Sequence, residues 1–300
     1  MFHTLTINDK DAVQSRTLHN SLQNCNYSFA NLFGWSTLFG TEVWFPDEAT
    51  AVFRLLFGDG AASYLINSPQ APTEALLQAL TSSDYGRQEG KPLRLVALTD
   101  DHAADLAARH PEAIVNPQRN SQDYIYLRSD LESLAGKHLK AKRNHVNAFL
   151  SEYPDYQYRP LTPALLDRCM MLEHLWRDGA PHQNPLWGDT IEAEQQVMEN
   201  VFGHWDELGM IGGAIFIGDE MVAFSYGDAV TDNTFDVCVE KADRSINGAF
   251  NIINQQLVKH LPDNFIYINR EEDMGLEGLR KAKLAYHPVE LLSYNTVILG

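Results

Sequence analysis

The pattern of hydrophobic and polar positions predicts regular secondary structure over most of the second half of the chain. Short apolar runs rich in β-branched and aromatic residues predict strands, and apolar residues at helical spacing predict helices. We expect strands over residues 156–161, 210–217, 220–230, 233–240, 264–269 and 289–299. We expect helices over residues 163–178, 189–208, 248–261 and 275–286. Three consecutive strands followed by a strand–helix–strand connection predict a mixed sheet with helices on both faces.

The first half repeats this scheme with a weaker pattern. Two apolar runs flank Gly58-Asp59-Gly60 and predict a hairpin. The other elements expected there are helices over 71–80 and 100–110 and strands over 93–98 and 123–127. The order of elements resembles that of the GCN5-related N-acyltransferase (GNAT) fold. We therefore predict an α+β protein of two tandem GNAT-like domains, each with a mixed, mostly antiparallel sheet flanked by helices.

We place the boundary between the two domains near residue 135. The chain has no Gly-, Ser- or Pro-rich linker there, and a long helical stretch would join the two halves. The expected division is an N-terminal GNAT-like domain over 1–135 and a C-terminal one over 136–300. The second domain is expected to carry the active site.

The composition describes an acidic, folded protein. Asp and Glu number 40 against 23 Lys and Arg, which gives a formal net charge of -17. Phosphate affinity needs many cations, so we expect no sequence-specific nucleic-acid binding, and any anionic partner must meet a local basic patch. The three cysteines (Cys25, Cys169 and Cys238) have no paired spacing, which indicates a reducing cytoplasm. We expect no signal peptide and no transmembrane segment.

One basic stretch stands out in so acidic a chain. Residues 133–151 contain no carboxylate, although four cations lie there: Lys137, Lys140, Lys142 and Arg143. On a helix, Lys142 would lie within the apolar arc formed by Val146 and Phe149. Its stem could simply cover apolar surface while the ammonium reaches water. Alternatively, Lys142 enters a cleft and neutralises a phosphate or carboxylate, with Arg143 and His145 beside it, because an Arg fork binds phosphate oxygens in pairs.

Residues 269–288 form a second candidate site at the end of a predicted strand. We expect Glu271 or Asp273 to act as a general base and Tyr286 as a proton donor. The residues expected to bind an anionic donor there are Asn269, Arg280, Lys281 and Lys283. The helix dipole alone would also favour acids before a helix and bases near its end.

A third stretch runs from a strand into a helix start, where free N–H groups favour an anion. Arg244 and Gly248 are the candidates there. Acyltransferases that use acetyl-CoA keep an Arg/Gln-x-x-Gly-x-Gly/Ala loop at this place, and this chain has Asn247 where the first glycine belongs. A side chain at that place would restrict the close approach of a pyrophosphate, which argues against an ordinary CoA cradle. The eleven histidines show no HxH or HExxH spacing, so we expect no metal site.

The stretches 123–150 and 269–289, and more loosely 26–35, resemble the DUF2156 family. That family is related to the C-terminal catalytic domain of phosphatidylglycerol lysyltransferases. The resemblance implies tandem acyltransferase-like domains similar to the Fem-type peptidyltransferases. It also implies that Lys142, Arg143 and Asn144 correspond to a Lys-Arg-Asn run of the family and bind an anionic donor or acceptor.

The resemblance implies an aminoacyl- or acyltransferase with an anionic, activated donor. The expected donor substrate is an aminoacyl-tRNA-like molecule or an acyl-CoA, and the expected acceptor is a lipid headgroup or a small-molecule amine or hydroxyl. Two alternatives stay open: an acyl-CoA-dependent N-acyltransferase, and a ligand-binding protein that kept the fold without turnover. The expected location is the cytoplasm, including the surface of the membrane.

Overall fold

The computed structural model describes residues 1–19, 22–56, 62–82, 91–178 and 190–300. The predicted hairpin turn at Gly58–Gly60 and the first residue of the helix predicted over 189–208 lie outside the described residues.

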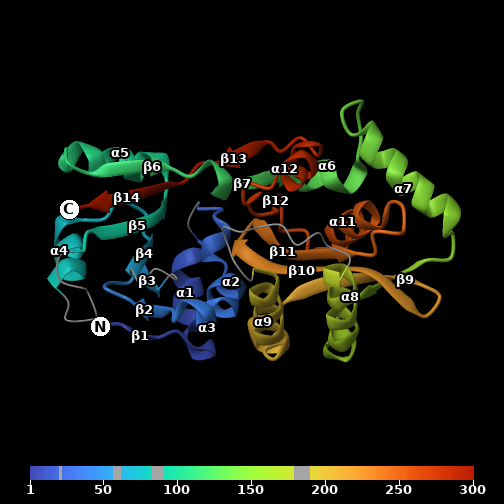
Figure 1. Ribbon diagram of the computed structural model, residues 1–300, viewed down its shortest axis with the longest axis horizontal. Helices are drawn as coiled ribbons and strands as arrows, with labels where there is room; N and C mark the ends of the chain where they lie inside the picture. The colour runs from blue at the N-terminus through green and yellow to red at the C-terminus, as the bar shows by residue number, and fades with distance from the viewer. Residues whose placement is uncertain (20–21, 57–61, 83–90, 179–189) are drawn as a thin grey trace.

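The described residues form two seven-stranded sheets (Figure 1). The order in the first sheet is β1 (His3–Thr4), β2 (Glu42–Trp44), β3 (Ala51–Leu56), β4 (Ala62–Asn67), β5 (Leu93–Leu98), β14 (Asn295–Leu299) and β6 (Ile114–Pro117). The order in the second sheet is β13 (Glu290–Leu292), β7 (Asp123–Leu127), β12 (Tyr267–Asn269), β11 (Thr234–Ala242), β10 (Glu220–Thr231), β9 (Ile211–Ile217) and β8 (Gln157–Pro160). In each sheet one pair is parallel, β4 with β5 and β11 with β12, and the other pairs are antiparallel. The predicted mixed, mostly antiparallel sheets are confirmed.

The two halves of the chain exchange one strand each. Strand β14, from the C-terminal end, lies between β5 and β6 of the first sheet, and β7, from the first half, lies between β12 and β13 of the second. Figure 1 shows the red β14 among the green and cyan strands. The single last strand predicted over 289–299 is wrong, because the chain crosses from one sheet to the other at Ser293 and Tyr294. A domain boundary near residue 135 stays a prediction, and strands cross that point in both directions.

Helices cover the sheets on several sides. They are α1 (Lys10–Thr17), α2 (Phe29–Gly34), α3 (Ser36–Phe39), α4 (Glu74–Ser82), α5 (Asp100–Arg109), α6 (Arg128–Ser133), α7 (Lys140–Glu152), α8 (Leu166–Asp178), α9 (Thr190–Phe202), α10 (Trp205–Leu208), α11 (Ala249–His260) and α12 (Glu277–Leu284). In the part of the chain that the structure describes, none of them combines the length and hydrophobicity needed to cross a bilayer.

The long helical stretch predicted near residue 135 is interrupted. Helix α6 ends at Ser133. The next residue, Leu134, has a left-handed φ of 49°, and Gly136 follows with a φ of 82°. Two left-handed residues so close together cannot continue an α-helix. The stretch is therefore two helices, α6 and α7, with a turn between them.

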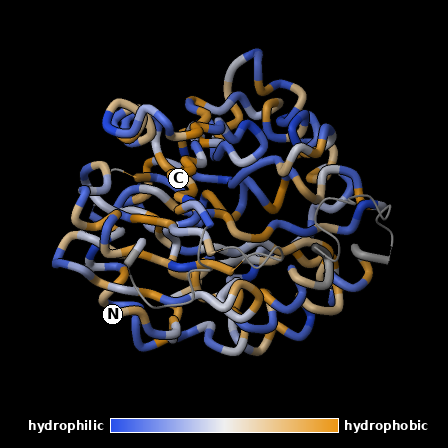
Figure 2. The backbone as a smooth tube through the Cα atoms, turned by 60° about the vertical axis from the view of Figure 1, so that its left-hand side comes forward, coloured by the Kyte–Doolittle hydropathy of each residue, from blue (hydrophilic) through white to orange (hydrophobic). Residues whose placement is uncertain are grey.

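Within the described ranges, three apolar clusters hold the elements together, and hydrophobic segments run through the interior in Figure 2. One cluster packs the first sheet against α4 and α5, and a second packs one face of the second sheet against α6, α7 and α11. The third joins both sheets through α2, α8 and α9. Because α2 belongs to this shared core, the residues just before α2 lie next to the second sheet. There the backbone N–H of Cys25 donates to Asp123 on β7.

Candidate active site

Strands β11 and β12 separate at the point where the candidate residues lie. Their parallel pairing runs from Thr234 and Tyr267 to Asp236 and Asn269. Beyond this point β11 continues to Ala242, while the segment that follows β12 leaves the sheet. The departing segment contains Glu271 and Met274, with left-handed φ values of 54° and 51°. Such backbone strain in residues other than glycine collects at functional sites.

Glu271 lies against a second carboxyl group, that of Asp236 on β11. One amide nitrogen, Nδ2 of Asn31 on α2, donates to Glu271 Oε1 at 2.8 Å and to Asp236 Oδ2 at 3.0 Å. Burial and the charge of Glu272 raise the pKa of Glu271 well above its ordinary range, and burial and the charge of Glu271 do the same for the pKa of Asp236. These two carboxyl groups therefore hold protons at a pH where ordinary carboxyls are ionised.

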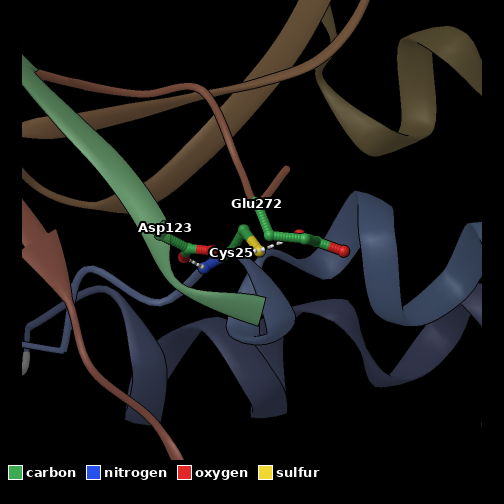
Figure 3. Close-up of side chains that lie close together, drawn as sticks. All are labelled: Cys25, Asp123 and Glu272. Atoms are coloured by element: carbon green, nitrogen blue, oxygen red, sulfur yellow. Dashed lines mark hydrogen bonds between the residues drawn. The ribbon is translucent and has the colours of Figure 1, made fainter. Parts of the chain in front are cut away.

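A second group joins three distant parts of the chain: Cys25 before α2, Asp123 on β7 and Glu272 after β12 (Figure 3). Asp123 is fully buried, and its Oδ2 accepts from the backbone N–H of Cys25 at 2.8 Å and from Asn269 Nδ2 at 2.8 Å. The Cys25 thiol donates to Asp123 Oδ1 at 3.2 Å. Asn269 thus positions a neighbouring carboxylate.

Among the described residues, two triads of side chains could supply ligands to a cation. They are Cys25–Asp123–Glu272 and Asp228–Asp236–Cys238, each with ligand atoms within 4.8 Å of one another. In the first triad Asp123 is already satisfied by donors from the protein, and in the second Asp228 accepts from the hydroxyl of Ser28 at 2.6 Å.

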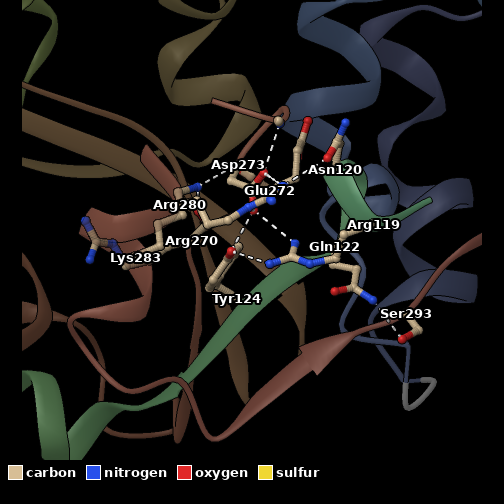
Figure 4. A network of polar contacts seen from close by, with 11 residues as sticks. Arg119, Asn120, Gln122, Tyr124, Arg270, Glu272, Asp273, Arg280, Lys283 and Ser293 are labelled. Carbon is tan, nitrogen blue, oxygen red and sulfur yellow. Dashed lines mark hydrogen bonds and ion pairs between the residues drawn. The ribbon is translucent and has the colours of Figure 1, made fainter. Parts of the chain in front are cut away.

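Asp273 occupies the centre of a network of donors (Figure 4). Its side chain is fully buried and accepts from Arg280 Nε and Nη2 at 2.9 and 2.8 Å, from Arg119 Nη1 at 3.0 Å and from the Tyr124 hydroxyl at 2.6 Å. Although burial opposes ionisation, these hydrogen bonds hold the pKa of Asp273 well below its usual range. A carboxylate so firmly ionised is a weak proton acceptor.

The two lysines of α12 have different surroundings. Lys283 is 8% exposed and donates to the carbonyl oxygens of Arg270 and Glu272, so it supports the strained segment after β12. Lys281 is exposed and pairs with Glu277 at 2.7 Å on the helix surface.

A separate cluster surrounds Tyr286, whose side chain is buried. Lys142 Nζ lies 4.2 Å from the centre of its ring, and the Arg270 guanidinium carbon lies 4.9 Å from it. Arg270 pairs with Glu240 at 2.9 Å, and Asn251 Nδ2 donates to the Tyr286 hydroxyl at 2.7 Å. Burial raises the pKa of Tyr286 to about 12.

The other candidates from the basic stretch and the loop before α11 have local contacts. Arg143 donates to the carbonyl oxygens of Leu134 and Gly136, which caps the end of α6, and Asn144 and Arg244 are exposed. Gly248 has a left-handed φ of 83°, and a Cβ there would overlap the carbonyl oxygen of His145 on α7. Close packing of α7 against α11 accounts for this glycine.

Sequence reasoning missed Asn31, Asp123, Asp236 and Glu240 as members of the site. The sequence does contain a signal that β11 contributes to the site. Three polar residues, Asp236, Cys238 and Glu240, lie at alternate positions of an otherwise apolar strand and therefore on the same face of the sheet. Asp123 begins an apolar run that was predicted to be a strand. A carboxylate buried there needs hydrogen-bond donors or a cation as partners, which was a second signal.

Comparison with known proteins identifies the family. The model of the family described as "Phosphatidylglycerol lysyltransferase, C-terminal" matches residues 20–296. The chain belongs to this family. The chain also spans 53% of the length of a curated relative, an uncharacterised protein of Mycoplasmoides gallisepticum, which is 20% identical over 170 residues or 56% of this chain.

Solved structures share the fold of this phosphatidylglycerol lysyltransferase-family chain. A conserved protein of unknown function from Bacteroides thetaiotaomicron is 36% identical, with a TM-score of 0.91 over 100% of this chain and 99% of that one. A C-terminal DUF2156 domain assigned to a lysylphosphatidylglycerol synthetase of Agrobacterium fabrum is 12% identical, with a TM-score of 0.62 over 98% and 93%. A tandem GNAT protein from the clavulanic acid pathway is 12% identical, with a TM-score of 0.51 over 100% and 98%. The predicted tandem GNAT-like fold and family are confirmed.

Proposed function

We propose that this protein transfers an aminoacyl group from an activated ester donor to an amine or hydroxyl acceptor, with Glu271 as the general base. The observation that carries this proposal is the position of Glu271. It lies beside Asp236 on a strained segment where β11 and β12 separate. The side-chain amide of Asn31, from the other half of the chain, donates a hydrogen bond to both carboxyl groups. Open α/β sheets bind ligands beyond the carboxyl ends of their strands.

The raised pKa of Glu271 suits a base. A carboxylate with an ordinary pKa is too weak to take a proton from an amine or hydroxyl, whereas a raised pKa brings proton affinity closer to the working pH. Asp273 is assigned a structural role, because its two arginine partners keep it ionised.

The proposed reaction forms a bond between the acceptor atom and the carbonyl carbon and breaks the ester bond to the donor. Glu271 takes the proton of the acceptor, and the Tyr286 hydroxyl gives a proton to the leaving oxygen. Glu271 gains one proton and Tyr286 loses one, and exchange with solvent restores both. No covalent enzyme intermediate is needed.

The family description supports transfer of a lysyl group to a phosphatidylglycerol headgroup. A small soluble amine or hydroxyl is the other acceptor class in this proposal. An acyl-CoA donor has less support, since the glycine at the start of α11 packs against His145.

A transfer assay tests the proposal. The purified chain is incubated with tRNA charged with radiolabelled lysine or alanine and with phosphatidylglycerol vesicles or a panel of soluble amines. Label that moves to lipid or amine with the wild type and is lost in Glu271→Gln supports the proposal. Acetyl-CoA consumption without aminoacyl transfer would replace it by CoA chemistry.

A further inference from the structure

Among the described residues, two neighbouring acids lack a cationic partner. Asp236 on β11 is fully buried, Glu271 follows β12, and Asn31 Nδ2 donates one hydrogen bond to each of them. The two accepting oxygens therefore lie no farther apart than the two bonds together. In the described part of the chain, no lysine or arginine lies within ion-pair distance of either carboxyl group. Ionised carboxyl groups inside a protein are normally paired with a cation.

One oxygen of this pair also lacks a hydrogen bond. Asp236 Oδ1 is buried and has no hydrogen-bond partner among the described residues. Asp228, which faces Asp236 from β10, differs in this respect, because it accepts from the Ser28 hydroxyl at 2.6 Å and from the backbone N–H of Ala30 at 3.1 Å. Buried polar atoms rarely lack a partner. Asp236 Oδ1 therefore points to a donor that a ligand supplies.

Lys283 on α12 does not supply this donor. It interacts electrostatically with Glu271, but its ammonium group donates to the carbonyl oxygens of Arg270 and Glu272. Within the described ranges the pair of acids therefore still lacks a cation.

We propose that the acceptor is a primary amine, which binds as an ammonium ion between Asp236 and Glu271. An ammonium group has three N–H donors, enough for Asp236 Oδ1 and the second oxygen of Glu271. Its positive charge also favours the ionised forms of both acids. A hydroxyl has one donor and no charge, so it would leave the pair incomplete. This inference rests on the proposed function, because it names the acceptor of that reaction.

Two carboxyl groups also match the number of protons that an ammonium ion must lose. Asp236 takes the first proton, which turns the nitrogen into a nucleophile. Glu271 takes the second proton as the C–N bond forms and the ester C–O bond breaks, and Tyr286 gives a proton to the leaving oxygen. Exchange with solvent restores the three side chains, and each turnover releases one proton. A hydroxyl acceptor has one proton to lose and needs Glu271 alone.

Binding is measured without a donor substrate, by NMR titration with two probes of similar size. They are propylamine, which is an ammonium ion at pH 7, and the uncharged 1-propanol. We expect the wild type to bind propylammonium at least about ten-fold more tightly than propanol. Asp236→Asn should weaken propylammonium binding about ten- to a hundred-fold, the scale of a hydrogen bond to a charged group.

The matched control is Asp228→Asn, which removes the facing carboxyl group. Both oxygens of Asp228 already accept hydrogen bonds from the protein, so this variant should change propylammonium binding less than about three-fold. Urea unfolding of both variants verifies that each is folded under the conditions of the titration.

A transfer experiment compares amine and hydroxyl acceptors directly. Labelled aminoacyl-tRNA is offered with soluble propylamine, or with phosphatidylcholine vesicles that contain phosphatidylethanolamine or phosphatidylglycerol. These last two lipids share the phosphodiester and differ in an amine against a hydroxyl. We expect an amine to be labelled at least about ten-fold faster than phosphatidylglycerol, and the labelled amine identifies a lipid or a soluble acceptor. In Asp236→Asn, transfer to the amine should fall more than transfer to the hydroxyl, which a purely structural role would not produce.

Equal binding of propylammonium and propanol, equal effects of the two asparagine variants, or faster labelling of phosphatidylglycerol would overturn the amine site. Amine binding that depends on Asp236, without transfer to any acceptor, would refute the proposed function alone. Transfer to phosphatidylglycerol without amine binding would refute this inference alone.

Discussion

Arg280 donates two parallel hydrogen bonds to Asp273, one to each carboxylate oxygen, at 2.9 and 2.8 Å. This bidentate pair, together with Arg119, ties α12 to the segment after β12. We expect Asp273→Asn to lower the free energy of unfolding by about 2–3 kcal/mol at pH 7, the scale of hydrogen bonds to charged groups. Urea denaturation measures it. Glu277→Gln on the surface of the same helix is the control and should change stability by less than about 1 kcal/mol. Equal stability of the Asp273 variant and wild type would contradict the structural role.

Glu271→Gln tests the proposed base. The amide keeps an oxygen to accept from Asn31, and burial already opposes the charged form of the carboxyl it replaces, so stability should stay within about 1 kcal/mol of wild type. Aminoacyl transfer should fall about 10²- to 10⁴-fold, the usual contribution of a general base. Because a base acts when deprotonated, kcat/KM of the wild type should rise with pH through a midpoint above the ordinary glutamate range. Full activity in the variant would remove Glu271 from the mechanism.

Asn31 should act on the same reaction through Glu271. Its hydrogen bond lowers the pKa of Glu271, against the larger effect of burial. In Asn31→Ala the pKa of Glu271 should rise further, so the pH profile of kcat/KM should shift to higher pH and approach the wild-type rate at its alkaline end. A loss of rate that is uniform at every pH would mean that Asn31 has no influence on the base.

Asp228 gives a pH dependence of stability with a defined sign. Burial raises its pKa to about 6 in the folded protein, whereas an unfolded aspartate titrates near 3.9. Between these values the unfolded chain releases a proton that the folded chain keeps, so this residue lowers the free energy of unfolding as pH rises from about 4 to 6.

In Asp228→Asn this contribution disappears. Relative to wild type, the variant should gain about 3 kcal/mol between pH 4 and 7, added to any constant loss from the contact with Ser28. Urea unfolding of both proteins across this pH range measures the difference. Parallel stability curves would mean that Asp228 titrates normally in the folded chain.

The exchanged strand β14 should be essential to the first sheet. Val297 and Leu299 are buried, and β14 separates β5 from β6. We expect a chain that ends at Ser293 to lose the cooperative unfolding transition, because burying Leu299 alone is worth about 2–5 kcal/mol and the strand pairs on both sides. Circular dichroism and limited proteolysis compare it with a chain lacking only Gly300, which should fold normally. Cooperative unfolding of the shorter chain would contradict this role.

The sequence by itself determined most of the individual elements. Periodicity is a local property, so the strands β9, β10 and β11 and the helix α11 could be predicted from runs of a few residues. The unusual position of Lys142 on its helix was also local, since it follows from the angle between neighbouring side chains.

Only the tertiary structure decided which residues meet. Asn31 and Glu271 are 240 positions apart, and Cys25 and Asp123 are 98 apart, so no local pattern could join them. The exchange of β7 and β14 brings each strand between two strands that are distant in sequence, and a short apolar run does not specify which sheet it enters. The environment also gave the carboxyl groups opposite pKa shifts, although Asp273 and Glu271 lie only two residues apart. Hydrogen bonds from arginines lower the pKa of Asp273, whereas burial beside another acid raises the pKa of Glu271.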